Sequence, residues 1–190
     1  MTSLISLYDF AVRQVIKLDA LLPIAARFLF AAVLLVYFWR SGTTKLGDGL
    51  FGFLSPSTGA YAQIFPKTFE AVGYDASQLG LFHWAVVTAG TWAEFILPLL
   101  IVLGLFTRLA SLGMIGFVVV QSLTDLYGHG GIEHAATLGA WFDRAPDGVI
   151  LDQRAFWVFG LSVLVIKGAG ALSVDHLLTA RQGRALPASA

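Results

Sequence analysis

One carboxylate interrupts the apolar run WAEFILPLLIVLGLFTRLASLG, which occupies residues 92–113. Glu94 stands where a membrane helix is expected, and an ionised side chain at the middle of a bilayer costs ~2.5–3.5 kcal/mol on insertion scales. Pro98 follows four residues later and cannot donate a backbone hydrogen bond to the carbonyl of residue 94. This turn of the helix therefore carries a carboxylic acid side chain and a backbone carbonyl that lacks its helical hydrogen-bond donor. It indicates either an interhelical hydrogen bond that fixes helix rotation, or a protonatable group beside a lipophilic substrate such as a quinone.

Other side chains extend this site along the same helix. Steps of three and four residues place a stripe on one face, formed by His83, Val87, Gly90, Thr91 and Glu94. A stripe with His83 near one surface and Glu94 deep inside is suited to conducting protons to a buried site. The alternative is that the small residues of the stripe only let a neighbouring helix approach closely.

Arg27 is the basic residue that we expect within the bundle near Glu94. It lies about 9 Å from the start of the first expected span, whereas Glu94 lies roughly 18–21 Å from the turn at Arg108. A direct pair with Glu94 therefore requires staggered helices or a long reach, and a water chain between the two groups is equally plausible.

A second polar cluster lies in QSLTDLYGHGGIEHA, residues 121–135. Its carboxylates and imidazoles are ligand types suited to zinc, copper or iron. The candidate ligands are Asp125, His129 and His134, with Glu133 near them and His83 joining them if it lies on the same side of the membrane. The spacing matches no metal motif, and a helix end capped by glycine explains these residues better. We therefore expect no metal cofactor.

The composition places these residues in a membrane. The chain has 190 residues, of which 57% are hydrophobic and 13% are charged, and its mean hydropathy is +0.76. Soluble domains contain about 25% charged residues. The formal net charge is zero, which gives no basic field for nucleic acid. Cysteine is absent, so disulfides, cysteine-ligated clusters and thioether-linked haem are excluded.

The hydrophobic blocks predict an all-α protein, a transmembrane antiparallel four-helix bundle preceded by an amphipathic helix at residues 4–19. A single transmembrane domain is expected over residues 1–178. Its spans are expected at about 21–39, 79–106, 109–127 and 154–172, with an interfacial cap at 40–78 that contains a short helix near 57–71, a polar loop at 128–153 and a disordered tail at 179–190.

The positions of Lys and Arg predict the orientation. Four spans put the N-terminal arm, the turn between the second and third spans and the end of the fourth span on one side. These segments carry Arg13, Lys17, Arg108, Lys167, Arg181 and Arg184. We therefore expect both termini in the cytoplasm. The first twenty residues do not resemble a signal peptide.

Three separated stretches resemble the DoxX-like family of small membrane proteins. They are RFLFAAVLLVYFWRSGTTKLGDG, with Arg27, Gly42, Lys45 and Leu46; WAEFILPLLIVLGLFTRLASLG, with Glu94 and the turn at 104–108; and GAGALSVDHLL, with Gly168, Gly170, Ser173 and Asp175. The resemblance implies a four-helix protein of a bacterial inner membrane. Some family members are subunits of quinone-reducing, sulfur-oxidising complexes, and others occur with oxidative-stress or metal-handling systems.

These observations lead to a first hypothesis and two alternatives. The first is a membrane subunit of an oxidoreductase assembly that binds a quinone or similar lipophile without a redox centre of its own. Glu94, His83, Thr91 and Arg27 are then the ligand-binding or proton-conducting residues. The alternatives are a non-catalytic anchor or accessory subunit, and a metal-handling protein. Structural roles are expected for Pro98, Gly104, Arg108, Asp175 and Lys45. The expected partners are membrane lipids and either other subunits or further copies of the chain. No nucleophile–base pair indicates an enzyme that acts alone.

Overall fold

The computed structural model describes the backbone of residues 2–185 and the side chains of residues 4–180. Over this range the chain forms helices and no strands, which confirms the all-α prediction. The helices are α1 (Thr2–Ile16), α2 (Leu22–Phe30), α3 (Val36–Thr43), α4 (Thr58–Ile64), α5 (Pro66–Ala71), α6 (Leu81–Leu103), α7 (Thr107–Leu123), α8 (Ala135–Leu138), α9 (Ala155–Lys167) and α10 (Val174–Ala185).

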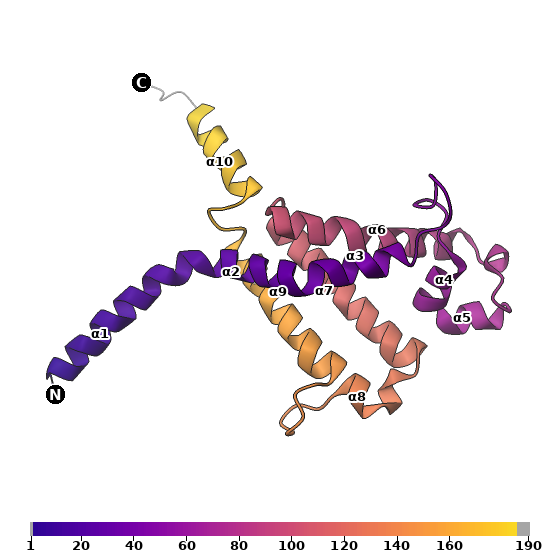
Figure 1. Cartoon of the computed structure of the whole chain (residues 1–190), viewed down its shortest axis with the longest axis horizontal. Coiled ribbons are helices and arrows are strands. Elements are labelled where there is room, and N and C mark those ends of the chain that lie inside the picture. Colours follow the sequence, from indigo (N-terminus) through magenta and orange to yellow (C-terminus); the bar gives the residue numbers. More distant parts are fainter. Residues whose placement is uncertain (1, 186–190) are drawn as a thin grey trace.

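Four helical stretches among the described residues are long and apolar enough to cross a membrane, as the sequence predicts. They are Leu4–Thr43, Leu81–Leu103, Thr107–Gly128 and Val149–Lys167. The first consists of α1, α2 and α3, joined by a 3-10 turn and a π-helical turn. The last two contain π-helical turns at residues 124–128 and 149–154. Figure 1 shows α1, α10 and the α6–α7 turn at one end of the bundle and α4 and α5 at the other.

The spans differ from the expected ranges at their ends. The amphipathic helix and the first span form one helical rod, because no glycine interrupts the junction and Pro23 falls in the first turn of α2, where proline is tolerated. α6 ends at Leu103 because Gly104 takes the left-handed conformation (φ 68°) that terminates helices. α9 ends at Lys167, before the positive φ of Gly168.

The expected cap and tail are also revised. The cap contains two short helices, α4 and α5, because Phe65 and Pro66 interrupt the predicted single helix. The tail expected from residue 179 is helical as far as Ala185, because the Ser173 hydroxyl accepts a hydrogen bond from the amide of His176 and starts α10. Residues 186–190 of that tail lie outside the described residues.

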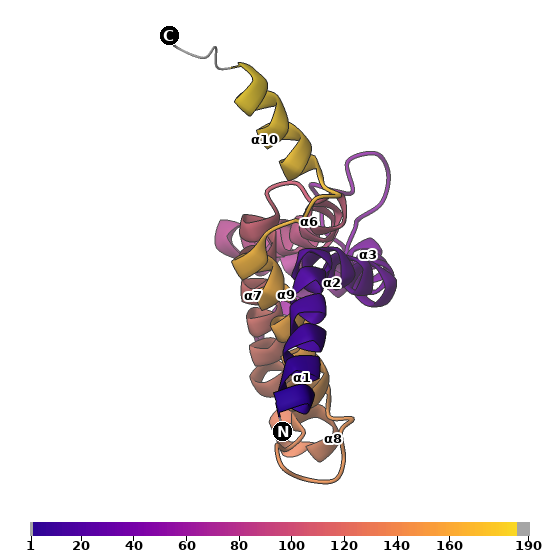
Figure 2. The same ribbon diagram turned by 90° about the vertical axis from the view of Figure 1, so that its left-hand side faces the viewer.

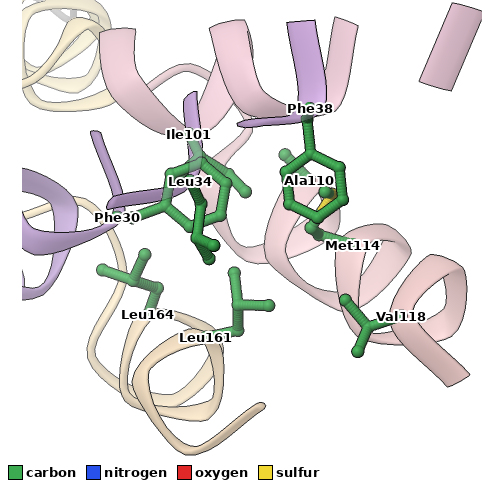
Figure 3. Close-up of a cluster of buried hydrophobic side chains, with 9 residues drawn as sticks. All are labelled: Phe30, Leu34, Phe38, Ile101, Ala110, Met114, Val118, Leu161 and Leu164. Carbon is green, nitrogen blue, oxygen red and sulfur yellow. The ribbon is translucent and has the colours of Figure 1, made fainter. Parts of the chain in front are cut away.

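The main core lies where the spans cross, as Figure 3 shows. Phe38 is fully buried and packs edge-to-face with Phe117, and the same buried cluster includes Met114 of α7 and Leu164 of α9. A second cluster joins α4 and α5 to Val87 of α6. The two clusters hold α6 at both of its ends, and Glu94 lies between them.

Candidate functional site: a buried ion pair beside a cavity

Glu94 forms a buried ion pair with Lys45. The Lys45 Nζ atom lies 3.0 Å from each carboxylate oxygen of Glu94. Ser41 completes the group, because its hydroxyl accepts a hydrogen bond from Lys45 at 2.7 Å and donates one to Glu94 at 2.9 Å. Lys45 is 5% exposed and Glu94 is 2% exposed. The attraction between the two opposite charges thus compensates for the hydration that each of them loses inside the helix bundle.

Local sequence explains why Lys45 reaches this depth. The hydroxyls of Thr43 and Thr44 donate to the carbonyls of Arg40 and Ser41, which are among the last carbonyls of α3. α3 ends at Thr43, so Lys45 lies just beyond the helix end. Gly42 lets α3 approach α6 closely, since a Cβ atom there would lie 2.7 Å from the ring of Phe95. The lysine therefore leaves a helix end that is already pressed against the turn containing Glu94.

The ion pair lies in the wall of a cavity of about 490 Å³ between α6 and α7. The two helices diverge from their shared turn toward the end that carries α4 and α5 (Figure 1). Both helices carry glycine in the cavity wall, Gly90 on α6 and Gly113 and Gly116 on α7, and the absence of side chains at these positions leaves space between the helices. The lining also includes Ile64, Val86, Ala89, Ala93, Leu97, Phe117 and Val120.

Polar side chains line the cavity toward the α4–α5 end, including Gln63, Gln121, Thr124, Asp125 and His129. Asp125 pairs with the buried Arg154 at 2.6 Å, and Arg154 also donates to the Ser122 hydroxyl. His129 Nε2 contacts the carbonyl of Gln63 at 3.0 Å. The cavity thus has two polar regions, one at the Lys45–Glu94 pair and one near its exposed end.

The residues considered as metal ligands do not converge. Asp125 is occupied by Arg154 and His129 by a backbone carbonyl, while His134 lies at the start of α8. In the part of the chain that the structure describes, no three His, Cys, Asp or Glu side chains lie close enough to hold a metal ion. The geometry therefore adds no support to the metal-handling hypothesis.

The predicted stripe on α6 divides into two parts. Val87, Thr91 and Glu94 are buried, and the Thr91 hydroxyl donates to the carbonyl of Val87. His83 lies apart from the cavity, where its ring contacts Phe65 and Phe82 and its Nδ1 atom is buried without a hydrogen-bond partner. A proton route from His83 to Glu94 stays a prediction, and the cavity offers a different approach to the acid.

Arg27 lies at the C-terminal end of α6, where it binds backbone carbonyls and does not contact Glu94. Its guanidinium group donates to four carbonyl oxygens, those of Ile101, Val102, Ala169 and Leu172. These carbonyls belong to the C-terminal end of α6 and to the segment after α9, which leave acceptors free where helices stop. Gly104 is needed beside it, because a Cβ atom there would lie 2.8 Å from the Arg27 guanidinium carbon.

Asp175 completes this helix-end clamp, which we define as Arg27, Gly104 and Asp175. Its carboxylate accepts hydrogen bonds from the amides of Phe106 and Thr107 and from the Thr107 hydroxyl, and its own amide donates to Gly104. Partial burial alone would raise the pKa of Asp175, but these hydrogen bonds and the nearby Arg27 charge hold the pKa below its ordinary value.

Arg108 and Pro98 also contribute to the architecture. Arg108 donates to the carbonyls of Val165 and Ile166 in the last turn of α9, each at 2.7 Å. Pro98 is buried inside α6. The roles expected for both residues are therefore compatible with their positions. The sequence suggests that Asp175 caps the short helix of residues 173–180 or pairs with Arg108, whereas its carboxylate caps the start of α7 instead.

Sequence reasoning did not identify two residues of this site, Ser41 and Arg154. Ser41 stands four residues before Lys45, a helical spacing that could have signalled a shared face. Arg154 was taken only as the start of a span, although an arginine followed by a long apolar run is a residue that needs a partner.

Comparison with known proteins agrees with this architecture. The sequence profile of the DoxX family matches residues 23–124, which is more than half of the chain. The protein therefore belongs to the DoxX family. Searches of curated proteins and of solved structures gave no significant match. The matched range contains the Lys45–Glu94 pair and most of the cavity lining, whereas Asp175 lies outside it.

Proposed function

We propose that this DoxX-family chain is a membrane subunit of an oxidoreductase assembly, and that it binds a quinone or a similar lipophile in the cavity beside Glu94. The observation that carries the proposal is the combination of a buried ion pair and an apolar cavity within membrane-spanning helices. Ligand pockets in proteins are typically ~300–1,000 Å³, mostly apolar, with a few placed polar groups. The cavity of about 490 Å³ has these properties.

The wall of the cavity supplies groups that suit such a ligand. Lys45 and Ser41 carry donors that suit a ring carbonyl, and Glu94 accepts from a hydroxyl. The exposed glycines 113 and 116 of α7 leave the cavity open on the outer surface of the bundle, where a lipophile arrives from the bilayer. The chain has no cysteine, so it carries no cysteine-ligated redox centre, and electrons would come from partner subunits. We place the protein in a bacterial inner membrane with both termini cytoplasmic.

The proposal is tested by filling the cavity without disturbing the core. Gly116 lines the cavity, and an added Cβ atom meets nothing within 4 Å, so Gly116→Leu projects into open space. Gly160 on α9 is equally open but does not line the cavity, so Gly160→Leu is the matched control. Both changes replace a helical glycine by the same side chain.

The measurement is binding of a short-tailed benzoquinone to the purified protein in detergent, followed by quenching of tryptophan fluorescence. We expect Gly116→Leu to weaken binding at least about tenfold, which is ~1.4 kcal/mol, while Gly160→Leu leaves it unchanged. Equal affinity of both variants and the parent protein would place the probe elsewhere and favour an accessory role.

A further inference from the structure

One close contact fixes the depth of Glu94 in the α6–α7 hairpin. Leu97 of α6 faces Gly113 of α7, since a Cβ atom on Gly113 would lie 3.3 Å from the Leu97 side chain. The two helices run antiparallel from their shared turn, so Glu94, which precedes Leu97 by three residues, lies at about the level of Gly116. The helical rise puts about 14 Å of α6 between Glu94 and the helix end at Leu103.

The path from Glu94 to the α6–α7 turn is apolar. Residues 95–103 of α6 read FILPLLIVL, without one polar side chain. On the facing helix, Ser111 is the single polar residue between positions 109 and 120, and it is fully buried. The buried core that fills this part of the bundle includes Phe38, Ile101, Met114 and Leu164. Water that approached from the turn would therefore find no polar partners.

The path in the opposite direction is lined by polar side chains. Gln121 and Thr124 lie in the cavity wall, about 8 Å and about 12 Å beyond the level of Glu94 on the same span. At the end that carries α4 and α5, the His129 Nε2 atom lies 3.0 Å from the carbonyl of Gln63. Both of these residues are exposed. We call Gln63, Thr124 and His129 the polar mouth of the cavity.

The cavity between Glu94 and the polar mouth has room for water. Its volume is about 490 Å³, whereas one molecule of liquid water takes about 30 Å³. Figure 2 shows α7 and α9 side by side as they run toward α8 and away from α6, so the space between α6 and α7 widens in this direction. A buried water needs about two to four polar partners, and the side chains along this wall supply them.

We propose that the cavity is a one-sided aqueous passage, through which Glu94 exchanges protons with water on the α4–α5 face of the membrane and not on the opposite face. The titratable side chains in its wall are Lys45, Glu94, Asp125 and His129. Asp125 is held by the buried Arg154. A proton that enters adds to the Glu94 carboxylate, and Lys45 then keeps its contacts with Ser41.

This passage is separate from the opening at Gly113 and Gly116, which faces lipid. A lipophilic ligand and protons would thus reach Glu94 by different routes. The inference depends on the cavity wall and not on the identity of the ligand, so the test below can succeed where benzoquinone fails to bind.

The test is the reaction of a single cysteine with a charged methanethiosulfonate reagent that does not cross membranes. The chain has no cysteine, and Ala93 lines the cavity next to Glu94, so Ala93→Cys places one thiol in the passage. Two exposed positions identify the faces, Phe142→Cys in the loop between α8 and α9 and Phe106→Cys in the α6–α7 turn. The reagent is added outside right-side-out and inverted membrane vesicles of the expression host.

We expect Ala93→Cys to react at least about tenfold faster in the vesicles that expose Phe142→Cys than in those that expose Phe106→Cys, a difference of ~1.4 kcal/mol in barrier. Equal rates from both faces, or a faster reaction from the Phe106 face, would overturn the proposal. A thiol at position 93 that reacts from neither face while both controls react would also overturn it, because the cavity would then be dry. Ala89→Cys, also in the cavity wall, repeats the measurement if the first variant misfolds.

Narrowing the polar mouth distinguishes the passage from a general loosening of the bundle. Thr124→Phe places a ring in the mouth and should slow the reaction of Ala93→Cys at least about fivefold. Leu123→Phe changes the neighbouring residue, which does not line the cavity, and is the matched control that should leave the rate unchanged. Equal rates in the presence of either change would show that the reagent enters by another route.

Discussion

The C-terminal end of α6 and the middle of α6 use charged side chains in opposite ways. At the α6–α7 turn, Arg27 and Asp175 bind backbone groups left over at helix ends. Near the middle of the helix, Lys45 and Glu94 bind each other, with Ser41 between them. Both groups are charged residues within or next to spans, and the sequence analysis expected ligand-binding roles for Arg27 and Glu94 and structural roles for Asp175 and Lys45. Their partners distinguish them.

The difference teaches which charges are available for function. A guanidinium group with four carbonyl partners has few donors left for a ligand, and its contacts would be needed at every stage of a reaction. A carboxylate–ammonium pair beside a cavity can exchange one partner for a ligand group or a proton. The contacts of the helix-end clamp therefore indicate an architectural role, and the Lys45–Glu94 pair is the one for which we propose ligand binding.

The largest effect that this comparison predicts is the loss of stability on replacing Arg27. Arg27→Leu leaves several carbonyls at the ends of helices without a donor, and each unsatisfied group costs ~1–3 kcal/mol. We expect a loss of about 4 kcal/mol, which corresponds to a fall in Tm of roughly 10 °C for a chain of this size. Thermal unfolding in detergent, followed by circular dichroism, measures it.

Arg40→Leu is the matched control for Arg27, because Arg40 lies on the same helical rod with an exposed side chain. It should change Tm by less than a third as much. Equal losses for both variants would contradict the clamp.

A thermodynamic cycle across the Lys45–Glu94 pair should give an effect of similar size. Lys45→Met and Glu94→Gln each leave a buried charge unpaired, which typically costs ~3–5 kcal/mol. The double variant removes both charges, so we expect it to be more stable than either single variant. Tm values of all four proteins measure the cycle, and additive losses would show that the two residues do not interact.

The same four proteins sharpen the comparison when benzoquinone binding is measured on them. The double variant should fold yet bind the probe at least about tenfold more weakly. Variants of the helix-end clamp should not weaken binding of the probe in this way, because the clamp residues do not line the cavity.

The smallest predicted effect is the pH dependence of the cap that Asp175 places on α7. Its pKa is lowered in the folded protein, so the carboxylate contributes stability above the unfolded pKa of ~3.9, and that contribution is lost as pH falls through the lower folded pKa. Asp175→Ala should lose ~1–2 kcal/mol at neutral pH. It should also unfold with a weaker pH dependence than the parent between about pH 5 and pH 3, as Tm measurements in matched buffers would reveal. A parallel decline of both proteins would contradict this assignment.

Much of the fold is predictable because long apolar runs leave few arrangements. The four spans and the tight turn near Gly104 follow from runs of apolar residues bounded by glycine and polar residues, whereas the first span runs to Thr43 and not to the expected end near residue 39. The continuous rod from Leu4 to Thr43 was not predicted, since periodicity indicates a helix but not whether two helices share an axis.

The partner of Glu94 was the main element beyond reach of the sequence. Lys45 was expected to be structural, and the depth estimate considered Arg27 as the only basic partner of Glu94. Arg27 lies within the helical rod Leu4–Thr43, whereas Lys45 follows the end of that rod. Counting residues from a helix end gives the position of a residue along that helix. Where two helices cross at an angle, residues at different distances from their helix ends can lie at the same depth in the membrane. The contact between Gly42 and Phe95 decides the register, and no local pattern encodes it.

The helix-end clamp also sets an order of events during synthesis. The α6–α7 hairpin leaves the ribosome well before Asp175, Ala169 and Leu172, which are the groups that cap its turn and bind Arg27. The turn of the hairpin therefore stays uncapped until the segment after α9 has been synthesised. The first span, the α6–α7 turn and that segment can join only then, and a chain that stalls before this step lacks these contacts.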